Sequence, residues 1–210
     1  ALFIAMMALP TTAQAQTEYD LKINGTRVTS DNCGDLSVID GVKGKVSYDH
    51  STKTLTLNNA TIKTSKNTAI SMNQEMKIKV VGKCKIDAGD YTAIFSTKGI
   101  YIYSERNVLD DQCLDVVSDD CAIFMNHTNL IIENCAVNTK GTGSGGVGIA
   151  GNYPEDKSTL TIKGDCTRVT EEGKGGSICS SLPSTAAPLL NLKEQHLMPR
   201  CKASHSTASW

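Results

Sequence analysis

The stretch LTLNNATIKTSKNTAI, residues Leu55–Ile70, decides the fold. It reads as two short strands, Leu55–Leu57 and Ala60–Ile62, followed by a polar turn into the pair Ala69–Ile70. Loosely similar stretches follow along the chain at Ile78–Ile94, Ile100–Ile123, Leu130–Ile149 and Leu160–Ile178. A period in the twenties to about thirty residues indicates a solenoid, in which each repeat packs only against its neighbours.

Two rows of apolar residues set the repeat. The first row begins an apolar-x-apolar strand in each unit and contains Leu55, Ile78, Ile100, Leu130 and Leu160. The second row contains Ala69–Ile70, Ala93–Ile94, Ala122–Ile123, Gly148–Ile149 and Ser177–Ile178. Each unit has three strand-like pieces and no helical spacing, which excludes helical repeats, and the leucine-rich consensus is absent. The pattern predicts an all-β parallel β-helix of about five coils over residues 50–180.

Composition and charge limit the class of protein. At 210 residues the chain has the length of one domain, and its net charge of -1 argues against a strongly basic nucleic-acid binder. Small polar residues are plentiful and aromatic residues few, which suits a solenoid whose buried column is thin. The composition therefore fits a β-solenoid, and we expect no nucleic-acid partner.

The first fifteen residues, 1–15, have the pattern of a secretory signal peptide. An apolar run over Ala1–Pro10 is too short to cross a bilayer and is followed by the small-residue pattern Ala13–Ala15. We expect cleavage after Ala15, a secreted protein (extracellular, periplasmic or at the cell surface) and no membrane span. The usual Met and basic start are missing, so we expect this to be a partial signal peptide. The alternative is a buried N-terminal helix.

Residues 16–49 are predicted to form an N-terminal cap. Asn24-Gly25 lies between alternating segments, which is a strong hairpin signal, and a second hairpin-like turn spans Asp49–Lys53. A solenoid exposes an unpaired strand edge at its end, and such an edge needs cover to avoid aggregation. We therefore expect these residues to cover the first coil with a β-hairpin.

The segments YDLKINGTRVTSDNCGDLSVIDG and VSYDHSTKTLTLNNATI resemble the secreted carbohydrate-binding β-helix proteins of anaerobic gut and oral bacteria. That family includes a polygalacturonate-binding, calcium-containing β-helix. The resemblance covers about Tyr19–Cys179. It implies a right-handed parallel β-helix, binding to an acidic polysaccharide such as polygalacturonate, and Ca²⁺ as a candidate cofactor. No binding residue can be transferred position by position.

Charge is segregated along the chain. From Gly41 to Ile100, four acidic residues oppose ten lysines, whereas from Tyr101 to Asn138, seven acidic residues oppose Arg106. A basic half could attract uronic-acid polymers by long-range steering. The outward positions of the first strand in successive units are expected to be Thr56, Lys79, Tyr101, Ile131 and Thr161.

The candidate carbohydrate-binding residues are Lys77, Lys79, Tyr101 and Tyr103. On a flat β face, a lysine offers a charge for a sugar carboxylate and a tyrosine offers a ring for the apolar face of the sugar. The alternative is that these are ordinary surface lysines that keep the strand faces soluble.

The third unit departs from the others by an insert between Ile102 and Cys113. Insertions in a repeat array map to loops on one face, and carboxylates gathered on a loop are the oxygen ligands that Ca²⁺ prefers. The candidate metal ligands are Asp110, Asp111 and Asp115. Their spacing matches neither the DxDxDG loop nor the glycine-rich nonapeptide calcium repeat, so a solvated acidic loop is the alternative.

The eight cysteines do not define a disulfide framework, because eight allow 105 pairings. The repeat places Cys84 and Cys135 where Ala60 lies, so both are expected to be buried as small apolar residues. Cys113 and Cys166 are expected at the same corner, one position out of phase. No CxxC occurs, which argues against a thiolate zinc site.

Catalysis has little support in the sequence, and we expect a non-enzymatic binder. The histidines are scattered, no GxSxG occurs, and the GxGxxG match at Gly143–Gly148 lacks a following helix. A polysaccharide lyase is the main alternative, with Arg106 beside the insert's aspartates as its candidate cluster. Five coils give only about 24 Å of solenoid at ~4.8 Å per strand, which is short for a lyase groove. A structural or adhesive surface protein is the third class.

The repeat ends near Ser180. Residues 181–210 hold three of the five prolines and do not continue the row of anchor pairs. We expect an irregular or disordered tail, either native or the product of a frameshift. An uncapped last coil would leave an edge through which copies of the chain could self-associate.

Overall fold

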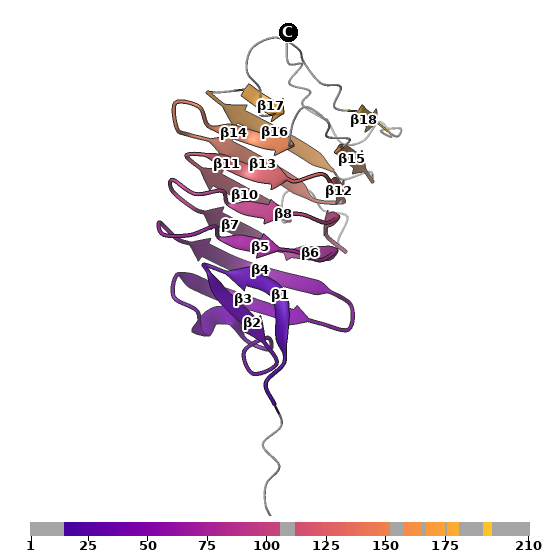
Figure 1. The fold of residues 1–210 in the computed structure, drawn as a ribbon. Coiled ribbons are helices and arrows are strands. Elements are labelled where there is room, and N and C mark those ends of the chain that lie inside the picture. Colours follow the sequence, from indigo (N-terminus) through magenta and orange to yellow (C-terminus); the bar gives the residue numbers. More distant parts are fainter. Residues whose placement is uncertain are drawn as a thin grey trace, which may run out of the picture.

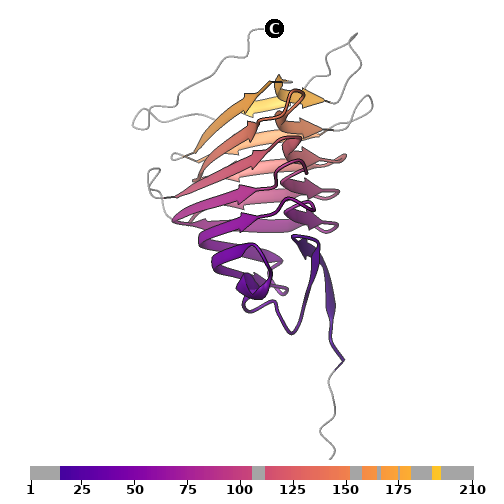
Figure 2. The same cartoon turned by 90° about the vertical axis from the view of Figure 1, so that its left-hand side faces the viewer.

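The computed structural model describes residues 15–105, 112–151, 158–164, 167–174, 176–180 and 191–194. Within this part of the chain the protein is a parallel β-solenoid (Figure 1; Figure 2), as the repeat predicts. Residues 1–14 of the expected signal peptide, most of the acidic insert and most of the expected tail lie outside the described residues. The described part of the tail, Asn191–Glu194, forms a strand that pairs with Thr159–Lys163, where an irregular tail was expected. No described helix is long and apolar enough to cross a membrane.

Three rows of parallel strands, here called faces one, two and three, form the solenoid. Face one contains the first half of β4 (Thr54–Lys63), then β6 (Met76–Val81), β9 (Ile100–Tyr103), β12 (Asn129–Glu133), β15 (Thr159–Lys163) and β18 (Asn191–Glu194). Face two contains the second half of β4, then β7 (Lys83–Asp87), β10 (Cys113–Ser118), β13 (Ala136–Gly141) and β16 (Arg168–Gly173). Face three contains β5 (Ile70–Met72), β8 (Ile94–Ser96), β11 (Cys121–Met125), β14 (Val147–Gly151) and β17 (Gly176–Ser180).

The coil count is slightly lower than the sequence suggested. Face three holds five parallel strands, and the chain winds about 4 times to connect them, where about five coils were expected. Faces one and two belong to one 11-stranded sheet because β4 runs through both of them, whereas face three belongs to a separate 7-stranded sheet.

The interior is a column of aliphatic side chains. On face three the register aligns Ile70, Ile94, Ile123, Ile149 and Ile178, which confirms the second apolar row of the sequence. The first four are buried, with relative exposures of 0%. Burying one such side chain contributes roughly 1.5–3 kcal/mol, so the stacked isoleucines are a main source of stability.

The register predicted for the first apolar row is wrong by two residues between β6 and β9. Ile78 lies beside Leu55 as expected, but Ile100 pairs with Met76, and Ile78 pairs with Ile102. A shift of two residues keeps every side chain on the same side of the sheet, because strand side chains alternate with a period of two. The apolar pattern alone therefore could not distinguish the two registers.

The cap closes the N-terminal end of all three faces, as the hairpin signals predicted. β1 (Glu18–Ile23) and β2 (Thr26–Thr29) form the hairpin around Asn24-Gly25, and β1 pairs antiparallel with β5. A 3-10 turn (Leu36–Val38) leads into β3 (Val42–Asp49), which pairs antiparallel along nearly all of β4. The cap lies at the indigo end of the solenoid (Figure 1). It supplies hydrogen-bond partners to strands that would otherwise be open edges.

The cap's own last strand is also protected. Asn32 follows β2 and folds back on it, since its side-chain oxygen accepts from the Thr29 N–H at 2.8 Å and its amide donates to the Arg27 carbonyl at 3.2 Å. The side chain thus occupies positions that a further strand would use. This contact limits edge-to-edge pairing at the N-terminal end of face three.

Cys84 and Cys135 are both buried, as the sequence predicted, but only Cys84 lies at the predicted position. Cys84 is 4% exposed and occupies the column of Ala60, whereas Cys135 is fully buried but lies two positions before that column, which Val137 fills. Cys113 is one position out of phase with Cys84, as expected. Burial raises the pKa of the Cys135 thiol to about 12 and also raises that of Cys84, so both act as apolar residues. Cys166 lies outside the described residues.

The corner between faces one and two depends on left-handed backbone. Asn59 has φ of 46° and Gly82, on the next coil, has φ of 70°. The side-chain oxygen of Asn59 accepts the Lys83 N–H at 3.3 Å, and a Cβ at Gly82 would lie 2.2 Å from that oxygen. Only glycine fits this position without displacing Asn59.

We therefore predict that Gly82→Ala lowers the free energy of unfolding by roughly 1–3 kcal/mol, because it strains the backbone and displaces Asn59. Urea unfolding followed by circular dichroism measures this. Gly145→Ala is the matched control, since a Cβ there meets nothing within 4 Å and no positive φ is present, so its effect should stay within about 0.5 kcal/mol. Equal stability of the two variants would contradict this account of the corner.

Candidate functional site

Face one carries two outward rows of side chains that run along the solenoid. The register places Thr54, Lys77, Tyr101, Ile131 and Thr161 in the first row. It places Thr56, Lys79, Tyr103, Glu133 and Lys163 in the second row. The four predicted carbohydrate-binding residues, Lys77, Lys79, Tyr101 and Tyr103, thus form a block of two columns on adjacent strands.

The expected outward row is wrong in one respect. It placed Lys79 beside Tyr101, but Lys77 is the neighbour of Tyr101, and Lys79 is the neighbour of Tyr103. The reason is the two-residue difference in register between β6 and β9 described above. The difference leaves all four side chains on the outer surface, since it preserves the alternation.

The two tyrosines form a stacked pair. Their ring centroids are 4.9 Å apart and the ring planes differ by 11°. Both residues are half-buried. Because the rings stack face to face, each hides one face of the other, and a ligand can reach only the outer faces and the edges of the pair.

Tyr101 is also fixed from the next two coils. Its hydroxyl donates to Oε2 of Glu133 at 2.5 Å, and Nζ of Lys163 lies 2.9 Å from the same oxygen and 5.4 Å from the Tyr101 ring centroid. Burial and the bonded carboxylate raise the pKa of Tyr101, while the hydrogen bonds from Tyr101 and Lys163 lower the pKa of Glu133. The ring is therefore held in place before any ligand arrives.

The two lysines differ in their availability. Nζ of Lys79 lies 2.6 Å from Oε2 of Glu105, and the lysine side chain is 24% exposed. Lys77 is exposed and forms no ion pair with a described residue. Lys77 is accordingly ready to meet an anion, whereas an anion at Lys79 must compete with Glu105.

Glu105, Glu133 and Lys163 were not identified as site residues from the sequence. Glu133 and Lys163 belong to the same outward row as Lys79, and a correct register between β6 and β9 would have placed them there. They lie roughly thirty and sixty residues from the tyrosines in the sequence and meet Tyr101 only because the coils stack.

Of the three predicted metal ligands, only Asp115 lies among the described residues. Asp110 and Asp111 lie outside the described residues. Asp115 faces outward on β10, where its Oδ1 accepts from the Asn138 amide at 2.7 Å and from the Cys113 thiol at 3.4 Å. Among the described residues no three acidic, histidine or cysteine side chains are grouped so as to hold a metal ion. Asp115 thus takes part in a polar contact between β10 and β13.

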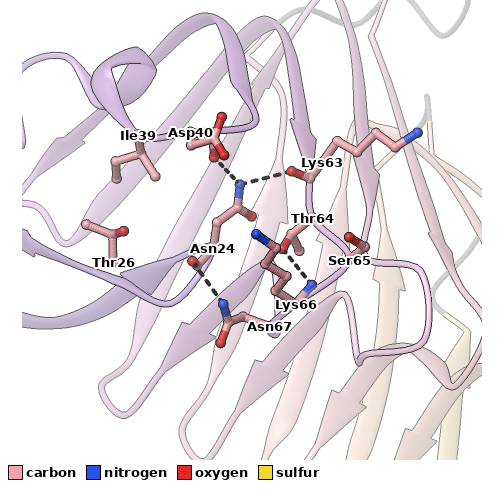
Figure 3. A pocket seen from close by; sticks show the side chains of 9 residues that line it. All are labelled: Asn24, Thr26, Ile39, Asp40, Lys63, Thr64, Ser65, Lys66 and Asn67. Carbon is pink, nitrogen blue, oxygen red and sulfur yellow. Dashed lines mark hydrogen bonds between the residues drawn. The ribbon is translucent and has the colours of Figure 1, made fainter.

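A small pocket of about 230 Å³ lies where the cap meets the first coil (Figure 3). The Asn24 amide donates to the carbonyls of Asp40 at 2.8 Å and Lys63 at 3.1 Å, and so joins the hairpin to coil one. Its Oδ1 is buried and accepts no hydrogen bond from the described residues. The pocket is smaller than the ~300 Å³ at which typical ligand sites begin and contains no aromatic ring, so it is better explained as part of the cap junction.

Comparison with protein-family models, with curated proteins and with solved structures found no match to this chain. The geometry of the chain's own residues is therefore what supports a function.

The Tyr101–Glu133–Lys163 contact leads to a pH-dependent prediction. The pKa of Glu133 is lower in the folded protein than in the unfolded chain, so its stabilising effect is present above the unfolded pKa of roughly 4.3 and is lost as pH falls through the folded pKa. We expect the stability advantage of the wild type over Glu133→Gln to shrink between about pH 5 and about pH 3.

Urea unfolding of both proteins at a series of pH values measures this difference. Tyr101→Phe keeps the ring and removes the donor hydroxyl, so the pH-dependent part of the advantage should be smaller in that background. A difference between wild type and Glu133→Gln that does not change with pH would show that the hydrogen bonds do not stabilise the carboxylate.

Proposed function

We propose that this protein is a secreted, non-catalytic binder of an acidic polysaccharide such as polygalacturonate, and that face one is its binding surface. The observation that carries the proposal is the block in which Lys77 and Lys79 lie directly beside the stacked pair Tyr101–Tyr103. A uronate residue has a carboxylate and an apolar ring face, and this block offers a partner for each.

The shape of the surface suits a polymer rather than a small molecule. Face one is built from neighbouring strands whose outward residues form continuous rows, and the block lies on β6 and β9 within those rows. A polymer gains affinity from several weak contacts along such a surface, whereas a small ligand needs an enclosed pocket. The rigid tyrosine pair also lowers the ordering cost of binding.

Secretion and calcium are part of the proposal. Secretion rests on the apolar run and small-residue pattern before Gln16. Ca²⁺ would act by bridging the carboxylates of the polymer to the protein, with Asp110 and Asp111 of the acidic insert and Asp115 of β10 as the candidate ligands.

A single incubation separates the proposal from a lyase and from a structural protein. The protein is mixed with polygalacturonate, with and without added Ca²⁺. Retention of the protein on the polymer without an ultraviolet-absorbing unsaturated product supports binding, and appearance of that product indicates a lyase. Neither retention nor product indicates a structural or adhesive role and overturns the proposal.

We predict that Lys77→Gln weakens polygalacturonate binding roughly two- to fivefold, because it removes an exposed ammonium beside the tyrosine pair. Titration calorimetry at low salt measures the affinity. Lys22→Gln is the matched control, since Lys22 is also an exposed lysine on a strand, but it lies on the cap of face three. If Lys77→Gln and Lys22→Gln have equal effects, face one is not the binding surface.

Glu105→Gln should have the opposite effect. Removal of this carboxylate frees Lys79 from its ion pair, so the affinity for polygalacturonate should rise roughly two- to fivefold in the same titration. Glu18→Gln, which removes an exposed carboxylate paired with Arg27 on the cap, is the control and should leave affinity unchanged. An unchanged affinity in Glu105→Gln would mean that Lys79 does not contact the polymer.

A further inference from the structure

The lysines of face one continue onto face two. Coil 2 contains β6, β7 and β8, and its inward positions on β6 and β7 are apolar. Its outward positions on these two strands are Lys77, Lys79, Val81, Lys83, Lys85 and Asp87. We call the four lysines of this set the coil 2 belt. No other described coil has four lysines on faces one and two.

The belt is continuous around the corner of the solenoid. β6 ends at Val81 and β7 begins at Lys83, so Gly82 alone separates them. Gly82 has no side chain, and both strands belong to the same 11-stranded sheet. A chain that follows β6 on face one and turns onto β7 meets no side chain from Gly82, and its neighbours at the corner are the outward Val81 and the exposed Asn59 of coil one, whose carboxamide lies against Gly82.

Further lysines lie next to the belt at the cap end. Lys43 and Lys45 are exposed on β3, and Lys63 is exposed at the end of β4. The register puts Lys43 beside Thr61 and Thr61 beside Lys85. These three lysines form no ion pair with a described residue, so their field adds to that of the belt.

Among the described residues, few acidic groups face the belt. Glu105 pairs with Lys79 at 2.6 Å, and Asp87 pairs with Lys85 at 3.6 Å. Asp115 lies beside Lys85 on the next coil, where it is bonded to Asn138. Lys77 and Lys83 have no acidic partner among the described residues.

The distribution of charge favours one direction for a bound polymer. A chain parallel to the solenoid axis would leave the lysines after one coil and would next meet the tyrosines and then Glu133 on face one. On face two it would meet Asp115 directly after Lys85. A chain parallel to the strands would instead meet an ammonium at alternate residues, roughly 7 Å apart, on both faces.

We propose that one acidic polysaccharide chain lies along the coil 2 belt, parallel to β6 and β7, and passes from face one to face two around Gly82. This rests on the proposed function and adds to it the direction of the chain and a second group of contacts, Lys83 and Lys85. The tyrosine pair then lies along one side of the chain on face one, where it contacts sugar rings, while face two contributes charge alone.

The test compares two double variants that lose the same net charge. Lys83→Gln/Lys85→Gln removes the face-two half of the belt, and Lys22→Gln/Lys98→Gln removes two exposed lysines elsewhere. Each is titrated with polygalacturonate at low salt, beside wild type and Lys77→Gln. We expect the face-two variant to bind roughly five- to twentyfold more weakly than wild type and the control to change less than twofold. Urea unfolding checks that both variants are folded.

A charge-preserving variant makes the result specific. Lys83→Arg/Lys85→Arg keeps both positive charges and should retain wild-type affinity within about twofold, even if the glutamine variant proves unstable. The proposal is overturned if the face-two variant and the control lose affinity equally while Lys77→Gln still weakens binding, and the proposed function then stands alone. If wild type does not bind polygalacturonate, the proposed function fails and the belt proposal fails with it.

Discussion

Strand pairing between successive coils is the constraint on which the whole structure depends. Each interior strand bonds to the equivalent strand one coil before and one coil after it, so a side chain in one coil fixes what can lie beside it in the next. The isoleucine column of face three shows the consequence, since Ile94 and Ile123 are buried only because matching residues lie on both sides. A single coil could not bury its own isoleucine without a coil on each side of it.

The same pairing leaves unsatisfied groups at the ends, and the cap is the solution at the N-terminal end. β3 covers both halves of β4, and the hairpin covers β5. The cap is antiparallel, so it ends the parallel stacking instead of extending it. The Asn24 amide then joins the hairpin to the Asp40 carbonyl within the cap and to the Lys63 carbonyl of coil one (Figure 3), which explains the polar pocket at this junction.

With the inward positions filled by aliphatic residues, the outward positions are free to differ from coil to coil. On faces one and two, the coil nearest the cap carries threonines with Lys63 at the end of β4, coil 2 carries four lysines, the third coil carries tyrosines and an aspartate, and the fourth carries Glu133. These differences cost the fold little, because an outward residue contacts mainly its row neighbours. They allow one surface to combine a rigid aromatic pair, fixed by Glu133 and Lys163, with lysines that lie beside it.

The sequence by itself determined the solenoid, the cap and the identity of the outward lysines and tyrosines, because each of these follows from local alternation or from a turn signal such as Asn24-Gly25. It also determined the face-three register, because each Ile there directly follows a small residue and the pair can be aligned in one way only. On face one, the register predicted between β6 and β9 was wrong by two residues, because an apolar-x-apolar strand keeps the same alternation after a two-residue shift. Only the tertiary structure decided that Tyr101 meets Lys77, Glu133 and Lys163, and that Cys135 lies outside the Ala60 column. These are contacts between coils, and their partners depend on the length of every intervening turn, which periodicity does not specify.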